Sequence, residues 1–225
     1  SRYGSEQAGG HLDRLGGAGW QARKARMKER IKGMAEELIK VAAARTLQPA
    51  ARINAEEGSY DEFAARFPYD ETDDQRGAIE DVLEDLSGGR SADRLICGDV
   101  GFGKTEVALR AAFVTAMSGK QVAVVVPTTL LCRQHFQNFQ ERFKDFPVHV
   151  EQISRLVNQS KIKDAKEGMK TGRVDIVIGT HALLAQDVGF RDLGLLIVDE
   201  EQHFGVTHKE QLKKLKADVH VLTLT

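Results

Sequence analysis

Apolar residues recur at two different spacings along this chain, and each spacing predicts one kind of element. Between residues 20 and 46 there is no proline, and apolar side chains lie three or four residues apart, at Met27, Ile31, Met34, Ala35, Leu38 and Ala42. This is the period of an amphipathic α-helix, so we expect one long helix here. A second helix is expected after Thr72, because Thr72 and Gln75 have the spacing of a capping box.

Beyond residue 90 the pattern changes to short, continuous apolar runs that alternate with helical segments. The runs cover residues 94–97, 121–126, 148–153, 174–178, 195–198 and 219–224. Helical patterns lie between most of them, near residues 104–118, 129–143, 160–171 and 206–216. Strands that are buried on both faces and separated by helices predict an α/β fold, with a parallel sheet flanked by crossover helices.

The N-terminal part of the chain has a different character from this α/β region. Residues 1–19 are rich in glycine and short polar side chains, and residues 47–63 contain Pro49 and Gly58 in a linker-like stretch. We therefore divide the chain into an N-terminal segment with its long helix, residues 1–66, and an α/β domain, residues 67–225.

Composition narrows the class of protein without naming a function. Hydrophobic residues make up 41% of the chain and charged residues 29%, which is ordinary for a globular protein. Neither a membrane-length apolar stretch nor a signal-peptide layout is visible, so we expect a cytoplasmic protein without a membrane partner. Cys97 and Cys132 lack metal-ligand spacing and are interpreted as reduced thiols.

The near-zero net charge conceals a strong polarity along the chain. Residues 1–50 contain ten Lys and Arg against five Asp and Glu, a net of +5, whereas residues 51–100 contain five against fourteen, a net of −9. Much of the positive charge lies in the first half of the expected long helix. That basic face is either solvated or in contact with DNA or protein, and the sequence leaves the choice open.

Gly98 to Thr105 match the pattern G-x-x-x-x-G-K-[ST] of a phosphate-binding loop. The loop follows a predicted strand and opens a predicted helix, which is the context that the motif requires. Glycines let the backbone wrap around phosphates, while amides at the helix N-terminus point at the anion. Lys104 can reach the β- and γ-phosphates of ATP, and the Thr105 hydroxyl can ligate Mg²⁺.

An acidic pair supplies the partner that such a loop needs for its metal. The predicted strand at residues 195–198 ends in Asp199 and Glu200, and the carboxyl ends of parallel strands meet at one edge of a sheet. We expect Asp199 to hold Mg²⁺, and Glu200 to orient or deprotonate the attacking water. A GTPase would carry an N-K-x-D motif, which is absent, and the "LSGG" at residues 86–89 lies on the wrong side of the loop for a transporter ATPase.

Several segments together resemble the superfamily 2 helicases. They are "GDVGFGKTEVALRAAF", "VVVPTTLL", "QISR", "IGTHALL" and "LLIVDEEQHFGVTHKEQLK". The whole chain is most similar to the bacterial transcription-repair coupling factors, the Mfd family of double-stranded DNA translocases. The segment "HLDRLGGAGWQARKARMKERIKGMAEELIKVAAAR" of this chain resembles the helix that, in that family, lies between the polymerase-binding module and the motor. The resemblance implies a RecA-like first motor lobe that ends before a second lobe.

The resemblance also implies roles for individual residues. Nucleotide contacts would come from Gly98, Gly101, Phe102, Gly103, Lys104, Thr105 and Glu106, with Gln75 on the adenine and Phe67 near the base. Contacts to the DNA backbone would come from Pro127, Thr128, Thr129, Arg155, Gly179, Thr180 and His181. Taken alone, Thr128 and Thr129 could equally cap a helix, and His181 could be a loop histidine.

One position departs from the family pattern D-E-E-H-R-F-G. Gln202 stands where the family has a histidine that would link the γ-phosphate to the second lobe, and His203 stands in place of an arginine. Gln202 can still donate and accept hydrogen bonds, but it cannot titrate. The residues for hydrolysis are retained, so the departure puts the coupling of hydrolysis to movement in question.

The implied function is that of an ATP-driven translocase on double-stranded DNA, whose partners would be RNA polymerase and an excision-repair damage-recognition protein. A fork-reversing helicase of the RecG family is the alternative among enzymes, since it shares the motor motifs. For the isolated chain, a nucleotide-binding module with little turnover is a further alternative, because the arginine finger is expected in the missing second lobe.

Overall fold

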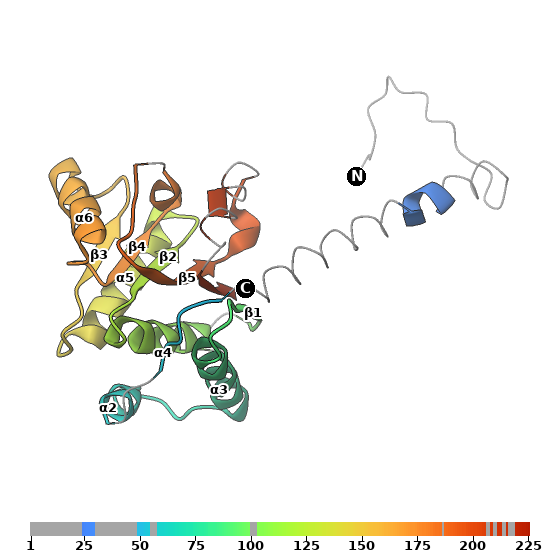
Figure 1. Cartoon of the computed structure of the whole chain (residues 1–225), viewed down its shortest axis with the longest axis horizontal. Coiled ribbons are helices and arrows are strands. Elements are labelled where there is room, and N and C mark those ends of the chain that lie inside the picture. Colours follow the sequence, from blue (N-terminus) through green and yellow to red (C-terminus); the bar gives the residue numbers. More distant parts are fainter. Residues whose placement is uncertain are drawn as a thin grey trace, which may run out of the picture. The chain divides into compact units, whose positions relative to one another are not determined.

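The computed structural model describes residues 24–29, 49–54, 58–99, 103–185, 187–205, 208, 211–212, 215 and 219–225. The chain divides into two units, Ser1–Arg45 and Thr46–Thr225 (Figure 1). In the first unit residues 24–29 are helical and exposed, and the remainder of the predicted helix over residues 20–46 lies outside the described residues.

The second unit is built on a six-stranded sheet. Its strands are β1 (Asp93–Ile96), β2 (Gln121–Val125), β3 (Val150–Ile153), β4 (Ile176–Gly179), β5 (Leu193–Asp199) and β6 (His220–Leu224). Their order across the sheet is β1-β6-β5-β2-β4-β3, and all neighbours pair in parallel. The six apolar runs therefore form the six strands, and the predicted parallel α/β sheet is confirmed.

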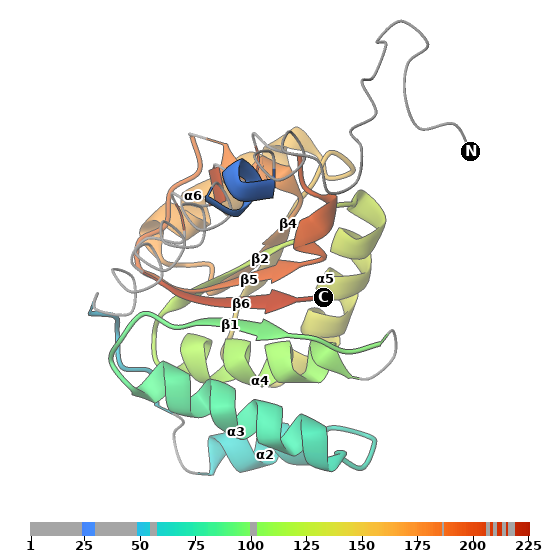
Figure 2. The same ribbon diagram turned by 90° about the vertical axis from the view of Figure 1, so that its right-hand side faces the viewer.

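Helices cover both faces of this sheet. They are α2 (Ser59–Ala65), α3 (Asp73–Ser87), α4 (Lys104–Met117), α5 (Thr129–Phe143) and α6 (Gln159–Thr171), with short 3-10 turns η1 (His181–Leu184) and η2 (Glu201–His203). Figure 2 shows α6 above the sheet and α4, α3 and α2 below it. In the predicted helix at 206–216, positions 208, 211, 212 and 215 are helical and the others lie outside the described residues.

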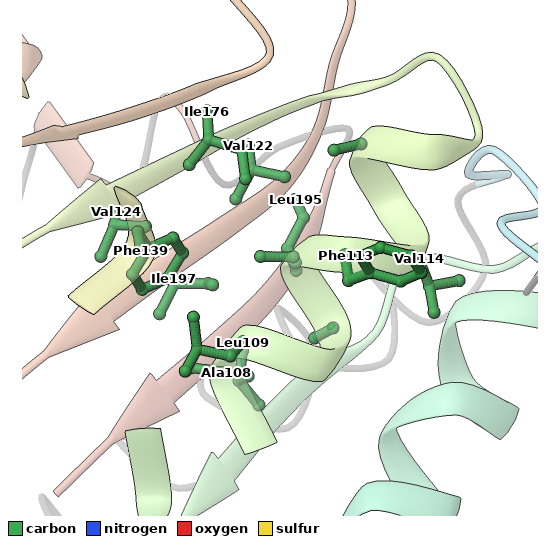
Figure 3. Packing of buried hydrophobic residues seen from close by; sticks show 14 of the residues in the cluster. Ala108, Leu109, Phe113, Val114, Val122, Val124, Phe139, Ile176, Leu195 and Ile197 are labelled. Carbon is green, nitrogen blue, oxygen red and sulfur yellow. The ribbon is translucent and has the colours of Figure 1, made fainter. Parts of the chain in front are cut away.

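Alternating side chains of each strand enter different cores because successive strand residues point to opposite faces. Val122 and Val124 pack with Phe113 of α4 and Phe139 of α5 in one core (Figure 3). Ala123 enters a second core, under α6. Full burial stabilises each large apolar side chain by roughly 1.5–3 kcal/mol, which explains why the central strands contain almost no polar residue.

The second unit begins earlier than the boundary that the sequence suggested at residues 66 and 67. The linker-like stretch 47–63 includes the first five residues of α2, and Phe63 of this helix is fully buried and stacks on Phe113 at 4.3 Å between ring centroids. Ile53 is 1% exposed, and its amide donates to the carbonyl of Leu86 at 3.0 Å. Because these apolar side chains lie in the core, the described residues between 49 and 66 pack with the α/β unit.

Candidate nucleotide and nucleic-acid sites

The functional side chains gather at one edge of the sheet. The phosphate loop follows β1, Pro127 follows β2, Arg155 follows β3, Thr180 follows β4, and Asp199 ends β5. All strands are parallel, so these five carboxyl ends share an edge. The strand order places the residues in two neighbouring groups, one over β1, β6 and β5 and the other over β2, β4 and β3.

The phosphate loop meets α4 at Gly103. Gly103 has a φ of 75°, a left-handed conformation that glycine adopts without a clash, and it is the N-cap of α4. The Lys104 ammonium donates to the carbonyl oxygens of Gly98 and of Asp99, the latter at 3.2 Å. Gly101 and Phe102 lie outside the described residues.

Gln75 lies against this loop. Its Oε1 accepts a hydrogen bond from the Thr72 amide at 2.9 Å, and the Thr72 hydroxyl accepts one from the Gln75 amide, so the predicted capping box at the start of α3 is confirmed. A Cβ on Gly103 would collide with the side-chain nitrogen of Gln75, which shows how closely the two residues approach. Phe67 is half-buried and packs edge-on against Tyr69, outside the groove described next.

The acidic pair at the end of β5, Asp199 and Glu200, lines a groove of about 1640 Å³ together with the phosphate loop. Its lining includes Gly103, Lys104, Thr105, His135, Asp199 and Glu200. Asp199 is 9% exposed, and its Oδ2 lies 2.8 Å from Nε2 of His135 on α5. The structure thus places the lysine, the hydroxyl and both carboxylates around one groove, as the motif spacing predicted.

Glu200 has an unusual backbone. Its φ is 53°, and among the described residues other than glycine it alone has a positive φ. Its amide donates a hydrogen bond to the Leu224 carbonyl at 3.0 Å. Its carboxylate accepts a hydrogen bond from the side-chain nitrogen of Gln202. The Gln202 side-chain carbonyl in turn accepts one from the Thr225 hydroxyl at 3.4 Å, so Gln202 connects Glu200 to the residue that follows β6.

Glu106 belongs to a different environment from the one that the resemblance implied. It is 4% exposed and does not line the groove, and its Oε1 accepts from Arg110 Nε at 2.6 Å and from Arg142 Nη2 at 2.7 Å. Burial raises the pKa of its carboxyl group, against the opposing effect of the two arginines. Successive helical residues turn by about 100°, so Glu106 points away from the face that carries Lys104 and Thr105 toward the loop.

A second groove, of about 560 Å³, brings together six of the seven residues expected to contact DNA. Pro127, Thr128, Thr129, Arg155, Thr180 and His181 all line it. Gly179 directly precedes Thr180, and a Cβ there would lie 2.8 Å from the Ile153 carbonyl oxygen and collide with Leu183. Glycine therefore permits the close packing of β4 against Ile153 and Leu183, while Gly179 itself does not line the groove.

The lining of the second groove is neutral or basic. Among the residues that the structure describes, Arg155, His181 and Lys166 are its titratable members, and no Asp or Glu lines it. Lys166 pairs with Asp187 at 2.5 Å, and this hydrogen bond lowers the pKa of Asp187. Hydroxyls, amides and cations without carboxylates are the groups that bind phosphodiester oxygens irrespective of base sequence.

Sequence reasoning missed several residues of these grooves, among them His135, Gln159 and Lys166. His135 lies on the buried face of α5 with Cys132 and Phe139, at the three- and four-residue spacing that could have drawn attention to a polar side chain in an apolar stripe. Gln159 and Lys166 line the second groove from α6. Gln159 and Lys166 reach the groove because α6 connects β3 to β4, which pair in the sheet. No local sequence pattern encodes that pairing.

Comparison with known proteins agrees with this geometry. The profile of the DEAD/DEAH box helicases matches residues 72–225. The chain belongs to the DEAD/DEAH box helicase family. Within the described residues, this helicase chain has no helix both long and apolar enough to cross a membrane.

Curated relatives of this helicase chain are transcription-repair-coupling factors. The protein of Rickettsia bellii (strain RML369-C) is 52% identical over 228 residues, covering 100% of this chain and 20% of its own length. The protein of Staphylococcus aureus (strain USA300) is 49% identical over 221 residues, covering 98% of this chain and 19% of its own length. The resemblance to this family is confirmed, and the chain spans about a fifth of the length of these relatives.

A solved structure, RecG bound to a three-way DNA junction, has a TM-score of 0.72 and 33% sequence identity. The match covers 82% of this helicase chain and 25% of the RecG chain. Together with the helicase profile and the six-stranded parallel sheet, it establishes the predicted RecA-like α/β fold.

Proposed function

We propose that this chain is the first motor lobe of an ATP-driven translocase on double-stranded DNA. The observation that carries the proposal is the pairing of two grooves at one sheet edge. One groove holds Lys104, Thr105, Asp199 and Glu200, and the other holds hydroxyl and cationic side chains suited to phosphodiester oxygens. ATP would bind in the first groove and DNA in the second.

Each residue of the first groove then has a chemical task. The amides at the N-terminus of α4 and the Lys104 ammonium bind the phosphates, with Gln75 beside the loop to contact the adenine. Glu200 orients and deprotonates the attacking water, and Gln202 holds the Glu200 carboxylate in place. Gln202 is thus placed to connect the Glu200 carboxylate to Thr225, the residue that follows β6.

The groups present fit a magnesium ion shared with the nucleotide. No cluster of three or more His, Cys, Asp or Glu suited to hold a metal occurs among the described residues. Mg²⁺ in nucleotide sites commonly takes one or two protein ligands, with waters and phosphate oxygens for the rest. The Thr105 hydroxyl and the Asp199 carboxylate would supply the protein part, and the bound ion would neutralise charge on the phosphates.

In the whole protein this lobe would drive movement along duplex DNA that displaces stalled RNA polymerase and recruits an excision-repair damage-recognition protein. The support is the identity of 52% and 49% to proteins named transcription-repair-coupling factors over essentially the whole chain. A fork-reversing helicase lobe is the second candidate, favoured by the similarity to RecG, although the identity there is lower, at 33%.

The test is a titration of the chain with a fluorescent ATP analogue in the presence of Mg²⁺. We expect Lys104→Ala to abolish detectable binding, because it removes the cation that reaches the β- and γ-phosphates. Lys120→Ala is the matched control, since Lys120 pairs with Asp192 at 2.6 Å and lines neither groove.

Each result is informative because both variants can be checked for folding by circular dichroism. Binding by the wild type and by Lys120→Ala, but not by Lys104→Ala, would support the nucleotide site. Equal binding by all three folded proteins would contradict it. Slow hydrolysis alongside tight binding would agree with a lobe that needs its second half for turnover.

A further inference from the structure

The contact between His135 and Asp199 joins two elements that are distant in sequence. Asp199 ends β5, whereas His135 lies in the second turn of α5, and their side chains meet at 2.8 Å between Nε2 and Oδ2. The two side chains are 9% and 12% exposed, so this is a largely buried contact. The phosphate-loop motif and the acidic pair do not include His135.

The surroundings hold the imidazole in one orientation. Its ring packs edge-on against Phe139, with 6.4 Å between ring centroids, and both residues lie on the buried face of α5. Meanwhile His135 and Asp199 both line the groove with Lys104 and Thr105. The imidazole therefore lies between the hydrophobic core and the position expected for the nucleotide.

An aspartate without such a contact has considerable freedom. The torsion that rotates its carboxylate is broad and roughly two-fold, so either oxygen can face a ligand. A hydrogen bond to one oxygen selects which of the two is presented. Residues that orient metal ligands in this way commonly affect metal affinity by about 10- to 100-fold when they are replaced.

We propose that His135 is a positioning residue that, by engaging Oδ2 of Asp199, presents the other carboxylate oxygen to the magnesium of a bound nucleotide. This inference rests on the proposed function, because it assumes that Asp199 serves nucleotide-bound magnesium. It adds a residue on α5 to the machinery supplied by the phosphate loop and the acidic pair.

A pair of amide substitutions can separate this role from simple core packing. In His135→Gln the side-chain nitrogen would lie near the place of the imidazole Nε2, whereas the shorter side chain in His135→Asn reaches only about as far as Nδ1. Both replacements are polar, and the one methylene by which they differ affects packing, which the unfolding midpoint reports separately. The hydrogen bond to Asp199 is the feature expected to change the magnesium contribution.

His220 offers a matched control at a position away from both grooves. It is 1% exposed, and its Nε2 lies 2.9 Å from the Ala51 carbonyl oxygen. His220→Asn therefore removes an Nε2 contact from another buried histidine. Its effect measures what such a loss does to folding alone.

The experiment measures the affinity of the full chain for a fluorescent ATP analogue in saturating Mg²⁺ and in EDTA. The ratio of the two dissociation constants gives the contribution of magnesium. We expect His135→Asn to reduce this ratio by about tenfold or more, with EDTA affinity unchanged, and His135→Gln to restore most of it. His220→Asn should lower the unfolding midpoint and leave the ratio as in the wild type.

Two outcomes would overturn the inference while the proposed function stands. One is an unchanged magnesium ratio in His135→Asn, which includes an equal loss of affinity with and without magnesium. The other is a ratio in His135→Gln as low as in His135→Asn. If the wild-type chain bound no nucleotide in a Lys104-dependent manner, the proposed function would fail and the inference with it. If His135→Asn did not fold, a ratio in His135→Gln near the wild-type value would support the inference, and a tenfold loss would overturn it.

Discussion

At the scale of single residues, Glu200 shows how the backbone serves the site. A left-handed conformation costs a residue with a Cβ roughly 1–2 kcal/mol, and glycine would adopt it without that cost. Glycine, however, has no carboxylate. The hydrogen bonds from the Glu200 amide to Leu224 and from Gln202 to the Glu200 carboxylate hold the residue in this conformation. Strain at a side chain that faces the groove is consistent with a catalytic role for Glu200.

The two cysteines have opposite environments and predict different reactivity. Cys97 is exposed, whereas Cys132 is buried on α5, where burial raises the pKa of its thiol to about 11. At pH 8 we expect a thiol-specific reagent to modify Cys97 rapidly and Cys132 only after unfolding, because the thiolate is the reactive form. Cys97→Ser, which leaves Cys132 as the remaining thiol, is the control. Rapid modification of that folded variant would contradict the prediction.

The raised pKa of the Cys132 thiol also makes the stability of the fold depend on pH. An unfolded cysteine loses its proton near pH 9, whereas folded Cys132 keeps it to about pH 11. Between these values the folded state binds more protons, so this residue contributes stability below pH 9 and its contribution decreases as the pH rises toward 11. Urea unfolding of the wild type and Cys132→Ala across this range measures the difference, which should be smaller at the upper end.

Sequence predicts those site residues whose role is encoded locally. Lys104 and Thr105 follow from one contiguous motif, and Asp199 from the end of an apolar strand. His135 could not be assigned a partner in this way, since it lies 64 residues from Asp199 and meets it only through the packing of α5 on the sheet. Conversely, Glu106 adjoins the motif but faces two arginines, because helical phase and tertiary contacts decide its direction.

At the scale of elements, α5 is shared by both grooves. Its N-cap, Thr128, lines the second groove, and His135 lines the first. The Thr128 hydroxyl accepts a hydrogen bond from the Leu131 amide at 3.2 Å, so it is a helix cap. Whether the same hydroxyl also contacts DNA is the alternative that the sequence left open.

Substitution of Thr128 separates these two roles. Thr128→Ala should reduce the free energy of unfolding by about 1 kcal/mol through loss of the cap. We further expect it to weaken binding to a labelled duplex several-fold, measured by fluorescence anisotropy, while Thr128→Ser restores both properties. The salt dependence of binding should not change, because a hydroxyl releases no counterion.

Asn158→Ala is the matched control for the cap. Asn158 caps α6 by accepting from the Ser160 amide at 3.0 Å, and it does not line the second groove. This variant should lose similar stability and retain duplex affinity. If Thr128→Ala lost stability alone, its hydroxyl would serve the helix and not the DNA.

The elements differ in how well the sequence predicts them. The six strands were predicted because buried parallel strands are continuous apolar runs, and the bounds of α5 coincide with the expected residues 129–143. In contrast, α2 is only seven residues long, too short to form a stable helix by itself. Its stability comes from the packing of Phe63 on Phe113, a contact between residues 50 positions apart.

At the scale of the whole molecule, the two grooves explain how one lobe could link nucleotide and DNA. They lie over neighbouring strands of one sheet, and α5 borders both. A change at Asp199 could therefore reach the second groove through a single helix, α5. The relatives are about five times longer than this chain, so in the proposed motor this lobe would act with regions outside it.

The last prediction concerns which part of the chain folds independently, and in particular whether residues 46–66 belong to that part. We expect a fragment of residues 46–225 to unfold in urea at the same midpoint as the second unit of the full chain, because Ile53 and Phe63 remain in its core. A fragment of residues 67–225 lacks both side chains and should lose at least about 3–5 kcal/mol, the usual cost of deleting one buried phenylalanine. Phe63→Ala within residues 46–225 isolates that side chain and should account for most of the loss. If the two fragments were equally stable, residues 46–66 would be a linker after all, and the packing of Phe63 on Phe113 would contribute nothing to the fold.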